Sequence, residues 1–261
     1  MRLNLIEMGQ GGGAPLVLLH GLFGQAGNFG AVQKALAAQG RRVLALDLRN
    51  HGASPHDPVM GYAEMAADVA ETLQAHGAAP ADVVGHSMGG KVAMMLALTR
   101  PELVARLIVV DIAPVDYPPA YRPYAEAMLA MEMRPGLTRR EADAVLAGAV
   151  PSAGVRGFLL QNLRLGEHPG WRIGLAEIAA ALPQIEAAPD FPPGARFDSP
   201  VLVLAGENSD YIREEHRPLF RALFPALRFG RVKGAGHWVH AEQPEGFLAA
   251  LGTFLGPPQA G

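Results

Sequence analysis

Short apolar runs alternate with longer amphipathic segments along most of this chain. Runs such as Leu16–Leu19 and Val201–Ala205 are apolar at every position, which is typical of strands buried on both faces of a sheet. The longer segments repeat their apolar residues at helical spacing. We therefore expect an α/β fold with a mostly parallel central sheet and helices on both faces. The expected strands are Leu3–Glu7, Leu16–Leu19, Val43–Asp47, Asp82–Gly85, Leu107–Asp111, Val201–Ala205 and Leu227–Val232, and the expected helices are about Asn28–Gln39, Tyr62–His76, Gly89–Thr99, Arg213–Phe224 and Pro244–Leu255.

The alternation is interrupted once, between about Val115 and Pro200. There the strand pattern is lost, and helical patches are separated by helix-breaking residues. We expect residues 116–195 to form a helical cap, inserted into an α/β core of residues 1–115 and 196–261 and covering the carboxyl ends of the strands. The expected cap helices are Tyr121–Met133, Arg139–Ala147, Val155–Leu165 and Ile173–Ile185.

Ser87 has the sequence surroundings of a nucleophile elbow. The segment from Val83 to Lys91 reads VVGHSMGGK, with glycine two positions before and two positions after the serine. Such a strand-to-helix turn is so sharp that its central residue takes a positive φ, and the glycines let the backbone pass itself. We expect the Ser87 hydroxyl to stand exposed at the sheet edge, close to the N–H of Met88 and the following helix N-terminus.

A serine hydroxyl is a weak nucleophile at neutral pH, so Ser87 requires a base and a third group that orients the base. His237 lies in the segment GAGHW, after the last predicted strand. Its preceding glycines suit a tight loop that brings the imidazole over the sheet. His240 is the alternative, but it lies where a helix begins. We predict that His237 is the base.

The acid of the triad is ambiguous from residue placement alone. The usual slot, in the turn after Val201–Ala205 and three residues past a glycine, holds Ser209, and Asp210 lies one residue later. Asp111 ends the preceding strand and can also reach the histidine, with Asp116 a weaker neighbour. Residue placement alone favours Asp111 and Asp210 almost equally as the triad acid.

An oxyanion hole needs two preorganised donors. The N–H of Met88 is the first expected donor, and the loop HGLFG after Leu16–Leu19 supplies the second. We predict the N–H of Leu22, with that of Phe23 as the alternative. We expect His20 to be a buried residue that fixes this loop and His86 to point away from the site.

Two residues are candidates for contact with substrate. Phe23 flanks an expected oxyanion donor, so it should border the site. Asn50 lies in the turn DLRNHG, where the structural interpretation is the favoured one: Asp47 caps, Arg49 pairs with an acid and Gly52 makes the turn. If this turn does contact substrate, Asn50 is the best candidate.

Composition removes several function classes. The formal net charge is −3, 18% of residues are charged, and cysteine is absent. Without a basic patch or a long apolar span, neither nucleic acid nor a membrane is an expected partner. We expect a cytoplasmic protein that acts on a small molecule without a metal or an organic cofactor. The sequence does not indicate an oligomeric state.

Together, the segments HGLFG, DLRNHG, GHSMGGK, DIAPVDY and GAGHWVH resemble the α/β-hydrolase superfamily over nearly the whole chain. Within it, the chain resembles YbfF-type bacterial esterases and abhydrolase domain-containing protein 11. The resemblance implies an α/β-hydrolase fold and a serine at the position of Ser209. It also implies that Asp111 is the triad acid, with Ser209 hydrogen-bonded within the triad and Asp210 as the remaining alternative.

We therefore expect a serine carboxylesterase that hydrolyses small to medium esters or thioesters through an acyl-enzyme. The expected triad is Ser87, Asp111 and His237, with an oxyanion hole formed by Leu22 and Met88. The alternatives are a carbon–carbon bond or lactone hydrolase with the same triad, and a ligand receptor with little turnover.

Overall fold

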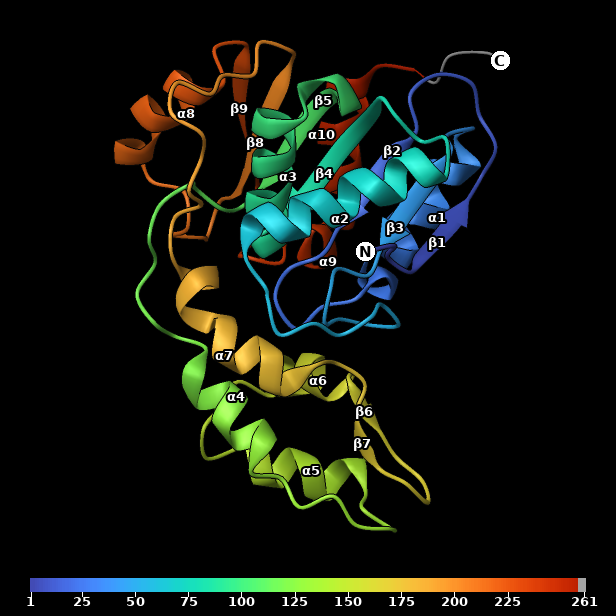
Figure 1. The fold of residues 1–261 in the computed structure, drawn as a ribbon, viewed down its shortest axis with the longest axis vertical. Coiled ribbons are helices and arrows are strands. Elements are labelled where there is room, and N and C mark those ends of the chain that lie inside the picture. Colours follow the sequence, from blue (N-terminus) through green and yellow to red (C-terminus); the bar gives the residue numbers. More distant parts are fainter. Residues whose placement is uncertain (258–261) are drawn as a thin grey trace.

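The computed structural model describes residues 1–257, in which a seven-stranded sheet is flanked by helices (Figure 1). The strand order is β1-β3-β2-β4-β5-β8-β9. Strand β1 runs antiparallel to β3, and all other neighbouring pairs are parallel. The predicted fold class is thereby confirmed. The strands are β1 (Leu5–Met8), β2 (Leu16–Leu19), β3 (Val43–Leu46), β4 (Ala81–His86), β5 (Val104–Val110), β8 (Val201–Gly206) and β9 (Leu227–Val232).

The central strands are apolar throughout because both of their faces are covered. In β4, Val83 packs in the cluster that contains α2 and α3, whereas Val84 packs in the cluster that contains α1 and α10. Neighbouring residues of a strand point to opposite faces, so the sheet needs an apolar residue at every position. The helices around the sheet are α1 (Gly30–Ala38), α2 (Tyr62–Ala75), α3 (Met88–Thr99), α8 (Arg217–Leu223), α9 (Val239–Glu242) and α10 (Pro244–Leu255), with short 3₁₀ turns at Ala26–Phe29, Pro101–Leu103 and Glu214–His216.

Residues 116–195, called the cap segment below, lie together at one end of the molecule (Figure 1). The expected helical character is confirmed, but the helices are shorter than predicted. The expectation that this region lacks strands was wrong, because a two-stranded hairpin follows the third cap helix. The cap elements are α4 (Arg122–Leu129), α5 (Arg139–Leu146), α6 (Ala153–Leu160), β6 (Leu163–Arg164), β7 (Gly170–Trp171) and α7 (Leu175–Glu186).

Lys91 on α3 joins the two places where the chain enters and leaves the cap segment. Its Nζ donates to the carbonyl oxygens of Val115 at 3.0 Å, of Glu186 at 3.4 Å and of Ala187 at 2.6 Å. The side chain is buried, and burial lowers the pKa of Lys91 to about 8. One ammonium group thus supplies the donor for the carbonyls of Val115 and Ala187, where the chain enters and leaves the cap segment, while the Glu186 carbonyl also accepts from the Tyr117 N–H at 2.9 Å.

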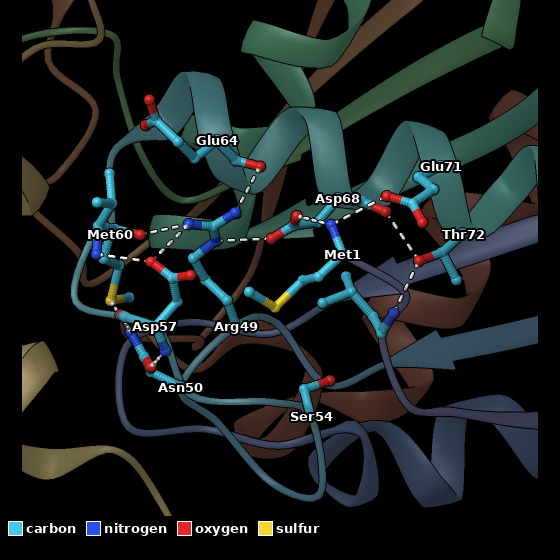
Figure 2. Close-up of polar contacts among 12 residues, drawn as sticks. Met1, Arg49, Asn50, Ser54, Asp57, Met60, Glu64, Asp68, Glu71 and Thr72 are labelled. Carbon is cyan, nitrogen blue, oxygen red and sulfur yellow. Dashed lines mark hydrogen bonds and ion pairs between the residues drawn. The ribbon is translucent and has the colours of Figure 1, made fainter.

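The turn after β3 is a buried polar structure, as the favoured interpretation predicted. The Asp47 carboxylate accepts from the N–H of Ala26 at 2.7 Å and from the N–H of Ala53 at 2.9 Å. Arg49 pairs with Asp68 through Nε and Oδ2 at 2.6 Å (Figure 2). Gly52 has φ +55°, and a β-carbon there would lie 2.1 Å from the Asp47 carboxyl carbon, so only glycine fits.

Among residues 1–257, no helix combines the length and the apolarity that a membrane crossing requires.

Candidate active site

Ser87 sits at the sharp turn between β4 and α3, as predicted. Its φ is +53° and its ψ is −123°, a conformation that residues with a β-carbon rarely adopt. The turn is so tight that a β-carbon on Gly85 would lie 2.1 Å from the carbonyl oxygen of Gly89. The Ser87 N–H donates to Val110 of β5 at 3.0 Å, which extends the sheet ladder to the turn. The sheet therefore fixes where the hydroxyl stands.

His237 lies in the loop between β9 and α9 and faces Ser87. The Ser87 hydroxyl donates to His237 Nε2 at 3.1 Å. The His237 carbonyl oxygen accepts from His86 Nε2 at 2.8 Å, and the Tyr211 ring stacks on the imidazole with centroids 3.9 Å apart. These contacts hold both the backbone and the ring plane of His237.

The structure places Asp111, and not Asp210, beside His237. His237 Nδ1 donates to Asp111 Oδ2 at 2.8 Å, and the N–H of Gly206 donates to Oδ1 at 2.9 Å. The Ser209 hydroxyl also donates to Oδ2, in the arrangement that the resemblance implied. Asp111 is fully buried, whereas the Asp210 side chain is exposed and makes no hydrogen bond to a residue in 1–257. Asp116 instead accepts from the N–H of Ala188 at 2.7 Å.

The loop after β2 forms a tight turn from Gly21 to Gly24, closed by a hydrogen bond of 2.9 Å between the N–H of Gly24 and the carbonyl oxygen of Gly21. Phe23, its third residue, has φ +60°. The Phe23 N–H donates to His51 Nε2 at 3.1 Å, so it is already used within the fold. Within residues 1–257, the N–H groups of Leu22 and Met88 donate to no protein acceptor. These two predicted donors are therefore free to bind an oxygen of a ligand.

Four histidines near the site are buried and held neutral. His20 accepts from the Leu48 N–H at 3.0 Å and so fixes the loop, as expected. Burial lowers the pKa of His20, of His51 to about 3 and of His240 to about 4, and it holds the pKa of His86 well below its usual value.

The expectation that His86 points away from the site was wrong. Its ring lies 4.8 Å from that of His237 and lines a cavity beside Ser87, and its hydrogen bond to the His237 carbonyl oxygen supports the His237 loop.

Two cavities meet at Ser87. The first, of about 290 Å³, is lined by His237, Phe23, Phe158 and Trp238. The second, of about 450 Å³, is lined by Met88, Ile112, Tyr62 and Lys91. Ser87, Leu22, Ala120, Tyr121 and Tyr211 line both cavities. A molecule bound at Ser87 can thus extend in two directions.

Phe23 borders the first cavity, as predicted, but the structure does not bring Asn50 to either cavity. The Asn50 side chain is fully buried, and its amide accepts from the Asp57 N–H at 2.7 Å and donates to the Asp57 carbonyl at 2.9 Å (Figure 2). Both ends of the amide are occupied, because Asn50 closes the turn in which it lies at φ +64°. Its position agrees with the structural interpretation.

Sequence reasoning missed two tyrosines in the wall of the site. Tyr121 of the cap segment and Tyr211 of the core share a hydrogen bond of 2.8 Å between their hydroxyls, and both line both cavities. Neither belongs to a motif, so the sequence gives no signal for their meeting. Among the described residues, no three His, Asp or Glu side chains gather as a metal site would require.

The chain is similar to known proteins in sequence and in fold. A model of the alpha/beta hydrolase family matches residues 16–250. The sn-1-specific diacylglycerol lipase ABHD11 of Mus musculus is 42% identical over 248 residues, which cover 92% of this chain and 80% of that protein. Esterase YbfF of Escherichia coli K12 is 37% identical over 261 residues, covering 98% and 99%. A solved structure described as a marine microorganism esterase superposes with a TM-score of 0.91 at 32% identity, covering 97% and 99%.

Proposed function

Because this chain belongs to the alpha/beta hydrolase family and its relatives are named esterases and lipases, we propose that it hydrolyses carboxylic esters with a triad of Ser87, His237 and Asp111. The observation that carries this assignment is the continuous hydrogen-bonded chain from the Ser87 hydroxyl through His237 to Asp111. Only this order lets one imidazole take a proton from a nucleophile and pass it to a leaving group.

The proposed reaction has two steps. Ser87 Oγ attacks the ester carbonyl carbon while its proton moves to His237 Nε2, and the N–H groups of Leu22 and Met88 bind the oxyanion. The tetrahedral intermediate collapses to an acyl-enzyme, and His237 returns the proton to the departing alcohol. Water then attacks the acyl carbon, with His237 as base, and releases the acid and Ser87. Asp111 keeps Nδ1 protonated and stabilises the imidazolium throughout.

The shape of the site supports substrates with two sizeable arms. The two cavities share Ser87 and have volumes of about 290 and 450 Å³, so the acyl part and the alcohol part of an ester can each occupy one of them. A thioester has the same geometry and is included in the proposal. Residues 116–195 act in it as a cap, since Phe158 and Tyr121 of that segment form walls of the cavities.

The test compares Ser87→Ala with Ser199→Ala, a serine outside both cavities. With p-nitrophenyl butyrate, Ser87→Ala should lose more than about 10⁴-fold in kcat, because no acyl-enzyme can form. Ser199→Ala should retain the activity of the unaltered enzyme. A fluorophosphonate should label the unaltered protein and Ser199→Ala but not Ser87→Ala. Full turnover by Ser87→Ala would refute the proposal.

A further inference from the structure

Asn162 of the cap segment contacts the turn from Gly21 to Gly24, which carries the proposed oxyanion donor Leu22. It follows α6 and is 1% exposed. Its Nδ2 donates to the carbonyl oxygen of Phe23 at 2.8 Å and to that of Leu159, in α6, at 3.2 Å. The first of these bonds crosses from the cap segment to the residue directly after the proposed donor Leu22.

Phe23 needs such support because its backbone conformation is costly. It has φ +60°, at the position where a type II turn demands a positive φ and where glycine is the usual residue. Aromatic residues rarely adopt this conformation, so they persist in it only where neighbouring groups enforce it. The turn is therefore held by contacts outside itself.

Those contacts come from two different parts of the molecule. His51, in the core, accepts from the Phe23 N–H at 3.1 Å, and Asn162, in the cap segment, donates to the Phe23 carbonyl at 2.8 Å. Both flanking peptide groups of Phe23 are thus fixed, one by each part. The bond to His51 involves no residue of the cap segment. The bond from Asn162 requires the cap segment to be packed against the core.

We propose that Asn162 is a positioning residue that couples the seating of the cap to the oxyanion hole, by holding the turn in the conformation that presents the Leu22 N–H. The inference rests on the proposed function, in which that N–H binds the oxyanion. Without Asn162, the strained Phe23 backbone can relax, and the Leu22 N–H no longer points at the position of the oxyanion. Because a small displacement of a catalytic group costs rate steeply, the loss should fall on kcat.

The test uses Asn162→Ala and the isosteric Asn162→Asp, which keeps the volume but cannot donate. Gln161→Ala is the matched control, since the neighbouring Gln161 also bonds across to the core, accepting from Asn28 Nδ2 at 2.8 Å rather than donating to Phe23. With p-nitrophenyl acetate, both Asn162 variants should lose about 10- to 100-fold in kcat with little change in KM, less than the loss of a whole oxyanion donor. Affinity for a trifluoromethyl ketone, which forms a tetrahedral adduct, should fall by a similar factor.

A rescue separates positioning from general support of the fold. Phe23→Gly places at this position the residue that adopts φ +60° without strain. In the Phe23→Gly variant, adding Asn162→Ala should therefore lower log kcat by less than half of the amount by which it lowers log kcat in the unaltered enzyme. Equal costs in the two backgrounds, or kcat values of the Asn162 variants equal to that of Gln161→Ala, would overturn the inference.

Two further outcomes are distinguishable. If Ser87→Ala retains turnover, the proposed function fails, whatever Asn162 does; if it loses turnover while the Asn162 variants match Gln161→Ala, only the coupling fails. Should the Asn162 variants not fold, amide hydrogen exchange on the unaltered enzyme decides. Binding of the trifluoromethyl ketone should then protect residues 22–24 and 159–162 together, and protection of the turn alone would contradict the coupling.

Discussion

The central sheet and the cap segment differ in how their residues are held. Strands β2, β3, β4 and β8 are buried at every position and hydrogen-bonded to a strand on each side. The cap segment consists of helices of 8 to 12 residues and a hairpin of two-residue strands, and it exposes large apolar side chains. These are Leu129, Val145 and Leu165, with exposed fractions of 49%, 52% and 38%.

This difference separates two tasks. The proposed triad residues Ser87, Asp111 and His237 are attached to the sheet, where the ladder and close packing fix their positions. Much of the cavity wall belongs to the part with less burial, where substitution costs less. Catalysis should therefore be most sensitive to changes in the core, and stability should respond to changes at the junction more than to changes on the outer face of the cap.

The largest expected effect is at the proposed triad acid. Asp111→Asn should lower kcat by about 10⁴-fold, because the amide no longer holds Nδ1 protonated or stabilises the imidazolium. Asp210→Asn should stay within about twofold of the unaltered enzyme, since its carboxylate is exposed and His237 Nδ1 is bonded to Asp111 instead. Steady-state hydrolysis of p-nitrophenyl esters measures both. A larger loss in Asp210→Asn would reverse the assignment.

At the junction between the two parts, Lys91→Met removes the shared donor of Val115, Glu186 and Ala187. Leaving the buried Val115 and Ala187 carbonyls without a donor should lower the free energy of unfolding by about 3 kcal/mol. KM for p-nitrophenyl esters should also rise, because the cavity wall is no longer held against the core. Urea unfolding and steady-state kinetics provide the measurements. Lys233→Met, at an exposed position, is the control, and equal behaviour of the two variants would show that the cap is held by other contacts.

Within the core, His240→Phe should change the pH dependence of stability. Burial lowers the pKa of His240 to about 4, and its Nδ1 has no partner among the described residues. In the unfolded chain the pKa is about 6.5, so between these values the unfolded state binds one more proton. Stability contributed by this site is full above pH 6.5 and is lost as pH falls toward 4, by up to about 1.4 kcal/mol per pH unit.

The phenylalanine variant lacks this dependence, so it should gain stability over the unaltered protein as pH falls from 7 to 5. Urea unfolding at several pH values measures the difference. His168→Phe, at an exposed position in the β6–β7 hairpin, should follow the unaltered protein. Parallel curves for His240→Phe and the unaltered protein would contradict the prediction.

The smallest effect is expected on the outer side of the cap segment. Thr138 is the N-cap of α5 and accepts from the Glu141 N–H at 3.2 Å in a capping box. Thr138→Ala should cost about 1 kcal/mol locally, visible as faster amide exchange in Arg139–Leu146, with kcat and KM unchanged. Thr138→Ser keeps the cap and serves as the control. A loss of activity in Thr138→Ala would show that this helix is coupled to the site.

Sequence patterns predicted the core well because its physics is local and repetitive. All seven strands of the sheet were expected, and the turn chemistry around Ser87 and Gly52 followed from steric limits on the backbone. The cap boundaries were less accurate. Helix α6 ends at Leu160, not Leu165, because the chain continues into β6, and two-residue strands leave no periodic signal.

The site shows the same division. Placement along the chain left Asp111 and Asp210 open, because the two residues follow different strands and only the folded loops fix which carboxylate faces the imidazole. Resemblance to the esterase family favoured Asp111, and the structure places the Asp111 carboxylate beside His237. Tyr121, Tyr211 and Asn162 were missed, since their roles depend on contacts between parts that are distant in sequence.

The convergence of Val115, Glu186 and Ala187 on Lys91 has a consequence for how this protein can change. The chain departs from and returns to the same point, so no ladder hydrogen bond of the main sheet involves the residues between. The stretch between Val115 and Glu186 can therefore be exchanged as one unit without breaking the sheet. A chimera in which this stretch comes from a relative, but Asn162 is kept as the donor to Phe23, should retain the reaction of the core and change the substrate selectivity.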